Sequence, residues 1–182
     1  MIDKLLDKNL FYLEFSKLKK KVASDRSLLD KFEVNSSVTL GWLLDNQDFV
    51  IQEIFNTIKK KSYKTPVAKE KKVLIKEKER LLYGFDWHEK VFQSVIAQVL
   101  TEAFEPILSD NLSSYRKGKG PYSTLIKLCE FLSDVGDKQS LFIIKKDIKS
   151  YGDSIDHEQL FDLLAKQIPK DDYLFDILKR II

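Results

Sequence analysis

The residues with the clearest capacity for chemistry lie in one segment, residues 143–157, which reads Ile-Ile-Lys-Lys-Asp-Ile-Lys-Ser-Tyr-Gly-Asp-Ser-Ile-Asp-His. A continuous apolar run over residues 140–144 predicts a buried strand, and this strand would carry Asp147 just past its end. A carboxylate in that place can reach Mg²⁺, a hard cation that prefers oxygen ligands. An aspartate after a strand is more often a turn or capping residue, so the segment alone does not separate a metal site from a turn.

A second candidate is the basic segment between Lys59 and Arg80. It holds ten Lys or Arg residues against three Glu, a net charge of +7, whereas the whole chain carries +3. A concentrated positive charge on a mildly acidic remainder is a candidate phosphate-binding surface. The alternative interpretation is a solvated, charged face.

The elements that would position these residues are mostly helices. Apolar spacing predicts helices over about residues 3–24, 38–60, 86–104 and 121–134, and two more from about 156 and 170. Two short strands, residues 71–75 and 80–85, are predicted around a charged turn. Asp86 with Glu89, and Asp156 with Gln159, have the spacing of capping boxes, and Ser36 or Ser37 is a candidate cap for the helix over 38–60. The sequence therefore predicts an α+β fold that is mostly helical.

Composition excludes several classes of protein. The chain has no apolar run near the roughly 20 residues that a membrane-spanning helix needs, so no membrane partner is expected. Cys129 is the single cysteine, which excludes an internal disulfide and a zinc site built on cysteines. A reducing, cytoplasmic location fits this cysteine usage best.

Three blocks of sequence, in order over about residues 60–165, carry a resemblance to a known family. The first runs from Arg80 to Gln93, where an arginine and a short strand precede a helix. The second, residues 97–118, contains Phe-Glu-Pro, then Ser-Asp-Asn and an Arg-Lys-Gly turn. The third is the segment over 143–157. Together they resemble reverse transcriptases of the group II intron, retron and phage-defence kind.

The resemblance implies a right-hand polymerase fold of which this sequence covers a part. Residues 1–60 would form a helical N-terminal extension, 61–135 the fingers with the short hairpin, and 136–182 the start of the palm with its first strand. The implied activity is RNA-directed DNA synthesis by two-metal nucleotidyl transfer, with Mg²⁺ as the cofactor. The implied partners are an RNA or DNA template-primer and deoxynucleoside triphosphates.

The third block carries the implied catalytic residue. By resemblance, Asp147 is a ligand to both metal ions, and the backbone carbonyl of Ile148 helps to bind one of them. Asp153 and Asp156 are interpreted as turn and cap residues rather than metal ligands. His157 is interpreted as a packing or hydrogen-bonding residue.

Basic residues of the first two blocks are the implied phosphate ligands. Arg80 and Lys90 would grip the incoming triphosphate, because an arginine fork matches phosphate oxygens. Template or primer phosphates would be contacted by Lys71, Lys72, Arg116, Lys117 and Lys119. For the last three, which lie on a loop with two glycines, solvated loop charge is the alternative.

One departure from the family concerns sugar selection. Five residues after the catalytic aspartate the family usually has an aromatic that blocks a 2′-hydroxyl, and this chain has Gly152 there. We expect relaxed sugar discrimination from this glycine. The competing explanation is a gap that shifts Tyr151 into the nucleotide-binding position.

A second departure concerns the metal ligands. The family's aromatic-x-Asp-Asp hairpin is absent, and Asp171-Asp172 reads as a helix cap instead. One aspartate cannot hold two metal ions, so we expect this chain alone to be inactive. The sequence is interpreted as a fragment or as one half of a split enzyme. Such a fragment would expose apolar palm surface and either self-associate or bind a chain that supplies the rest of the palm and thumb.

Several functions remain open at this point. The leading one is the N-terminal part of an RNA-directed DNA polymerase. Untemplated synthesis, as in phage-defence members of the family, is an alternative that the sequence does not separate from it. A non-catalytic nucleic-acid-binding module derived from a reverse transcriptase is another, and a purely structural helical protein is the last.

Overall fold

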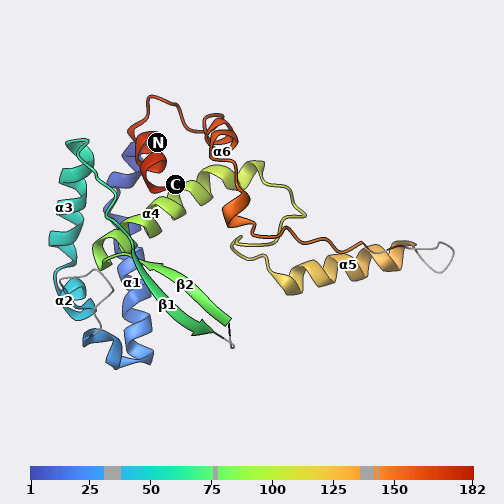
Figure 1. Ribbon diagram of the computed structural model, residues 1–182, viewed down its shortest axis with the longest axis horizontal. Helices are drawn as coiled ribbons and strands as arrows, with labels where there is room; N and C mark the ends of the chain where they lie inside the picture. Colours follow the sequence, from blue (N-terminus) through green and yellow to red (C-terminus); the bar gives the residue numbers. More distant parts are fainter. Residues whose placement is uncertain (31–37, 76–77, 136–141, 143) are drawn as a thin grey trace. The chain divides into compact units, whose positions relative to one another are not determined.

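The computed structural model describes residues 1–30, 38–75, 78–135, 142 and 144–182. It has an α+β fold that is mostly helical and holds one antiparallel hairpin (Figure 1). The chain divides into two compact units: unit 1 comprises residues 1–100 and 164–182, and unit 2 comprises residues 101–163. The predicted fold class is confirmed at this level. The predicted boundaries at 60 and 135, which follow polymerase subdomains, stay a prediction.

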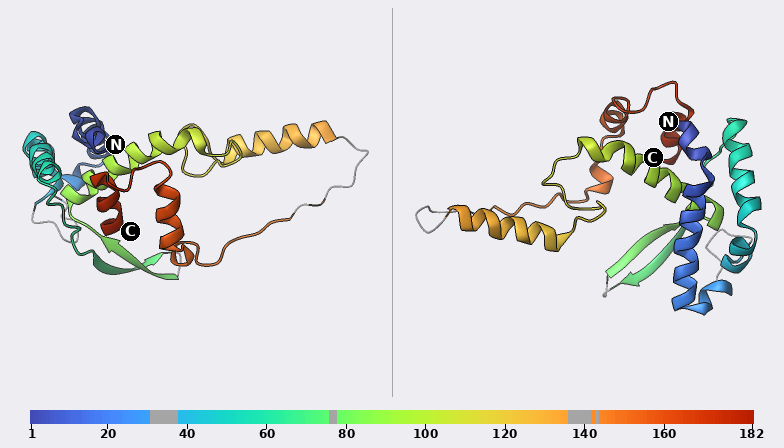
Figure 2. Two further views of the ribbon diagram at one scale, coloured as in Figure 1. Left: turned by 90° about the horizontal axis from the view of Figure 1, so that it is seen from above. Right: turned by 180° about the vertical axis from the view of Figure 1, so that it is seen from behind.

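Unit 1 is built mainly of helices and also contains the hairpin of β1 and β2. Its elements are η1 (Ile2–Leu6), α1 (Lys8–Ser24), η2 (Arg26–Asp30), α2 (Leu40–Asp45), α3 (Gln47–Lys59), β1 (Lys69–Ile75), β2 (Lys78–Gly84), the greater part of α4 (Trp87–Phe104) and α7 (Tyr173–Ile181). Helices α1 and α3 lie side by side (Figures 1 and 2). The core is apolar and aromatic, with Phe11 and Phe55 in edge-to-face contact at 5.5 Å between ring centroids. This burial of helix faces holds the unit together.

The helix predicted over residues 38–60 is in fact two helices, so that prediction was wrong in its middle. Asn46 leaves the helical conformation (φ −111°, ψ 27°), and its side-chain amide donates to the Trp42 carbonyl at 2.8 Å. An asparagine that bonds its own backbone competes with the helix in this way. Thr39 caps α2 by accepting from the Trp42 amide at 3.2 Å, whereas Ser36 and Ser37 lie outside the described residues.

Helix starts elsewhere agree with the sequence. Asp86 accepts from the Glu89 backbone amide at 2.8 Å, as a capping box requires. Asp156 accepts from the amides of Glu158 and Gln159 at 2.9 and 3.1 Å. Asp172 accepts from the Leu174 amide at 2.9 Å and caps α7, so the predicted cap in the Asp-Asp pair is confirmed.

Unit 2 contains η3 (Glu105–Ile107), α5 (Pro121–Val135), η4 (Gly152–Ser154) and most of α6 (His157–Leu164). Pro121 opens α5, as predicted. Large apolar side chains on α5 are exposed, including Tyr122 and Phe131. Of the buried strand predicted over 140–144, the structure describes Phe142 and Ile144, and both are exposed and lie outside any strand. The prediction is therefore wrong at these two residues, and the other residues of the run lie outside the described part.

Searching the described residues for a membrane span gave a negative result: no helix among them is long and apolar enough to cross a bilayer.

Candidate nucleic-acid interface

The hairpin of unit 1 separates basic side chains that are neighbours in the sequence. Strand β1 pairs with β2 in antiparallel register, with Lys71 opposite Leu82 and Val73 opposite Arg80. Residues paired in this way point to the same face of a ladder, and successive residues of a strand point to opposite faces. Lys71 and Arg80 therefore share a face, and Lys72 lies on the other one.

We call the first of these the basic face. It includes Lys69, Lys71, Val73, Arg80 and Leu82. Three of these five residues are cations and none of the five is an acid. Lys69, Lys71 and Arg80 are exposed, and the structure gives them no carboxylate partner among the residues it describes. Exposed cations without carboxylates are open to phosphate.

The opposite face, which we call the mixed face, carries two acids and one cation among its described residues. Glu70, Lys72 and Glu79 lie on it with three apolar residues, Leu74, Leu81 and Tyr83. The Lys72 ammonium is 3.5 Å from the Glu79 carboxylate, and both side chains are well exposed. Such a pair adds little stability, but it offsets the charge of Lys72. The prediction that grouped Lys72 with Lys71 as contacts to template or primer phosphates therefore combined residues from two faces.

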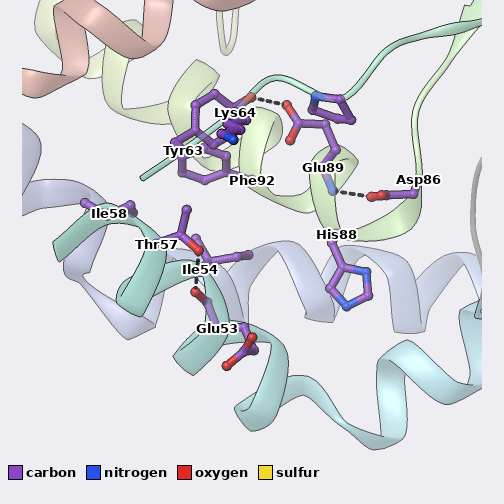
Figure 3. A pocket seen from close by; sticks show the side chains of 11 residues that line it. Glu53, Ile54, Thr57, Ile58, Tyr63, Lys64, Asp86, His88, Glu89 and Phe92 are labelled. Carbon is purple, nitrogen blue, oxygen red and sulfur yellow. Dashed lines mark hydrogen bonds between the residues drawn. The ribbon is translucent and has the colours of Figure 1, made fainter. Parts of the chain in front are cut away.

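The linker that leads into β1 is fastened to α4 and α7 through Tyr63. Its backbone amide donates to the Tyr173 hydroxyl at 2.9 Å, and its carbonyl accepts from the Arg180 guanidinium at 3.0 Å. Its own hydroxyl donates to the Glu89 carboxylate at 2.6 Å (Figure 3). The base of the hairpin is thus positioned by contacts from residues distant in sequence.

A cavity of about 260 Å³ lies beside this linker (Figure 3). It is lined by Glu53, Asp86 and Glu89 together with Lys64, His88 and apolar residues. Burial raises the pKa of the Glu89 carboxyl, and hydrogen bonds from Tyr63 and Gln93 oppose that rise. Burial, and next the bond to Glu89, raise the pKa of the Tyr63 hydroxyl. Three acids in its wall make this cavity a poor site for a triphosphate.

The two residues predicted to grip the triphosphate are both in unit 1. Arg80 lies on the basic face, and the Lys90 ammonium is 5.3 Å from the centroid of the Trp87 ring. A cation over an indole ring is a stabilising contact. Their joint role in binding a triphosphate stays a prediction.

In the loop over residues 105–120 of unit 2, the predicted phosphate ligand Arg116 is bound by other residues of the same loop. Arg116 has a side chain that is 5% exposed. Its guanidinium donates to the Glu105 carboxylate at 2.6 and 3.0 Å and to the carbonyls of Ser109 and Leu112 at 2.6 and 3.1 Å. The hydrogen bonding between the two side chains lowers the pKa of the Glu105 carboxyl and raises the pKa of the Arg116 guanidinium. Arg116 therefore holds the loop rather than offering its donors to phosphate.

The other two predicted cations of this loop differ from each other. The Lys119 ammonium is 3.0 Å from the Asp110 carboxylate, and this hydrogen bond lowers the pKa of Asp110. Lys117 is exposed and has no ion-pair partner among the described residues. Only Lys117 of the three is thus available for phosphate without breaking a contact seen in this part of the chain.

The predicted catalytic segment is open and irregular where it is described. Asp147 and Ile148 are exposed and lie in neither helix nor strand. Within the described ranges, no group of three or more His, Cys, Asp or Glu side chains could hold a metal ion. Asp147 alone does not fit a two-metal centre, so its role as a Mg²⁺ ligand stays a prediction.

The position predicted for the sugar gate has free space. Gly152 begins η4, and a Cβ added there would meet no atom within 4 Å. Tyr151, directly before it, is 63% exposed. A larger side chain at 152 would therefore be accommodated without a clash.

Two features escaped the sequence reasoning. One is the Tyr63–Glu89 contact, for which no local pattern exists. The other is Tyr115, whose side chain is fully exposed and whose φ is +59°. Its position between Ser-Asp-Asn and the Arg-Lys-Gly turn could have drawn attention to it.

Comparison with known proteins does not assign the chain to a family. No protein-family model matches the chain, and a search of curated proteins finds no match. A functional proposal therefore rests on the sequence blocks and on the two faces of the hairpin.

Proposed function

We propose that this chain binds nucleic acid through the basic face of its hairpin, as the fingers of an RNA-directed DNA polymerase of the reverse transcriptase kind. The observation that carries the proposal is the charge separation across the hairpin. Lys69, Lys71 and Arg80 share a face without an acid, while Glu70 and Glu79 lie on the other with Lys72.

The spacing of these cations suits a polyanion. Lys69 and Lys71 are two residues apart on one strand, which separates their Cα atoms by roughly 7 Å. Arg80 adds a third cation from the neighbouring strand. A row of exposed cations can contact successive phosphates of a strand, and each contact releases counterions. RNA or DNA template-primer is the proposed partner, and a cytoplasmic location is proposed with it.

Polymerase chemistry would need more than the described residues provide. In the segment that resembles the first catalytic motif, Asp147 is the one aspartate predicted to be a metal ligand, and the sequence lacks the second carboxylate motif. Binding of the Mg²⁺ ions and of deoxynucleoside triphosphates would therefore require further carboxylates, and another segment or chain would have to supply them.

The test compares single neutralisations on the two faces. Lys71→Gln and Arg80→Gln each remove one charge from the basic face, and Lys72→Gln removes one from the mixed face of the same hairpin. Binding of a labelled single strand is measured by fluorescence anisotropy between 50 and 200 mM salt. Each basic-face variant should bind more weakly and lower the magnitude of the log–log salt slope by about 0.7, the value for one single-strand phosphate contact.

The matched control decides whether the face or the net charge matters. Lys72→Gln should leave the slope nearly unchanged, because Glu79 already offsets Lys72. Equal effects at Lys71 and Lys72 would show that the faces do not matter. Absence of binding by the unsubstituted chain at 50 mM salt would refute the proposal.

A second candidate, a non-catalytic nucleic-acid-binding module, is favoured by the lack of a metal-holding group among the described residues. Asp147→Ala separates the two. A polymerase role predicts that this change abolishes Mg²⁺-dependent nucleotide incorporation by the assembled enzyme while binding persists. A module predicts no measurable change in either.

A further inference from the structure

Tyr115 is displayed at the surface of unit 2 in a conformation that tyrosine rarely adopts. Its relative exposure is 104%, so its ring packs against nothing in the described part of the chain. Its φ of +59° is in the left-handed region, which is a genuine outlier for a bulky residue. An exposed aromatic held in this way is not explained by packing within unit 2.

The residue after it explains how the conformation is held. Arg116 is buried and ties the loop together through the Glu105 carboxylate and the carbonyls of Ser109 and Leu112. With the Arg116 side chain directed inward, the neighbouring Tyr115 is directed to solvent. Strained residues persist where surrounding contacts over-determine them, and they gather at functional sites.

An exposed cation follows Tyr115 closely in the sequence. Lys117 is exposed two residues later, and Gly118 has a φ of +74°, so a glycine is used where the chain turns. An aromatic ring beside an exposed cation is the combination that binds a single strand, since the ring stacks on a base and the cation contacts a phosphate. An apolar partner surface would not need the cation.

We propose that Tyr115 is a stacking platform for an unpaired base of a nucleic-acid strand, with Lys117 on a neighbouring phosphate. The proposal rests on the proposed nucleic-acid-binding function and deepens it by adding a base contact in unit 2. Stacking is tolerant of base identity because every base has a π-face, so any sequence preference at this contact is weak.

The test uses three variants of the whole chain and two strands. Tyr115→Asn removes the ring and keeps a residue that tolerates a positive φ, so folding is not put at risk. Tyr115→Phe keeps the ring. Tyr122→Ala removes another exposed tyrosine of unit 2, at the start of α5. The strands are a labelled oligonucleotide of about 12 thymidines and one of the same length whose sugars lack bases.

The expected result is specific to the ring and to the bases. Tyr115→Asn should weaken binding of the thymidine strand by roughly 5- to 150-fold, the range for loss of one stacked base. Its affinity for the abasic strand and its salt slope should equal those of the unsubstituted chain. Its melting temperature should be unchanged or higher. Tyr115→Phe and Tyr122→Ala should bind both strands like the unsubstituted chain.

Three outcomes would overturn the inference. If Tyr115→Asn binds the thymidine strand normally while Lys71→Gln is weakened, Tyr115 does not stack and the proposed function stands. If Tyr115→Asn weakens both strands equally, its effect does not come from bases. If the unsubstituted chain binds neither strand, the proposed function and the inference both fail.

Discussion

Replacing Tyr63 by Phe tests how unit 1 holds the base of the hairpin. The change removes one hydroxyl, which donates to the Glu89 carboxylate at 2.6 Å, and keeps the ring that packs on Phe92 at 5.1 Å between centroids. Glu89 would keep the bond from the Gln93 amide at 2.7 Å. The variant therefore removes the hydrogen bond to the Glu89 carboxylate, together with a smaller interaction of the same hydroxyl with Thr65.

The size of the effect follows from the state of that carboxylate. A hydrogen bond to a charged group contributes about 1.5–3 kcal/mol, and we expect a loss of about 2 kcal/mol in the free energy of unfolding at a pH above the raised pKa of Glu89. When Glu89 is protonated the bond is neutral, and its loss should cost about 1 kcal/mol. The effect of Tyr63→Phe should therefore shrink as the pH is lowered.

The linkage between proton binding and folding predicts the same direction for the pH dependence of stability. Burial raises the pKa of Glu89 in the folded state, so between its ordinary and its raised value the folded chain binds more protons than the unfolded chain. Stability then falls as the pH rises through this window. The hydrogen bond from the Tyr63 hydroxyl lowers the pKa of Glu89, so removing this hydroxyl raises that pKa further. The loss of stability with rising pH then becomes larger.

Urea unfolding followed by tryptophan fluorescence is a suitable assay, because both tryptophans, Trp42 and Trp87, lie in unit 1. Tyr83→Phe is the matched control: Tyr83 is 60% exposed on the hairpin, and its change should stay within about 0.5 kcal/mol. A loss in Tyr63→Phe no larger than in this control, or one independent of pH, would refute the reasoning.

Three further predictions concern single side chains. Thr39→Ala should lower the stability of unit 1 by about 0.5–2 kcal/mol in the same urea assay, because it removes the cap of α2. Arg116→Lys cannot reproduce the fork on Glu105, so amide hydrogen exchange should accelerate across the loop over 105–120; unchanged exchange would contradict this. Gly152→Tyr should fold normally, since a Cβ there meets open space. Under the proposed polymerase function it should also suppress ribonucleotide incorporation, and an unchanged discrimination ratio would contradict the gate hypothesis.

What the sequence predicted well is local. The caps at Asp86 and Asp156 depend on residues two or three positions away, and both formed. The hairpin was predicted from two short runs around a charged turn, with bounds that shifted by about two residues. The break at Asn46 was missed because the apolar spacing of α2 and α3 continues across it.

What the sequence could not supply is long-range pairing. Glu89 has the spacing to complete its capping box, but its carboxylate bonds the hydroxyl of Tyr63 instead, 26 residues away in the chain. Tyr63 in turn bonds Tyr173, a separation of 110 residues. Such partners depend on how helices pack, and no periodicity encodes them. Strand alternation alone places Lys71 and Lys72 on opposite faces, but the face that Arg80 shares depends on the register, and a shift by one residue would move it to the other face.

Arg80 and Arg116 show why residue type alone is a poor guide to phosphate binding. The sequence assigned both to phosphates, yet Arg116 has its donors bound within its own loop, while Arg80 is exposed on a face without acids. Recruiting Arg116 to a phosphate would break bonds that are already made in a buried site, whereas Arg80 would gain bonds at the expense of water alone. A defect at Arg80 should therefore change the salt slope of binding. A defect at Arg116 should act through the position of Tyr115 and leave that slope unchanged.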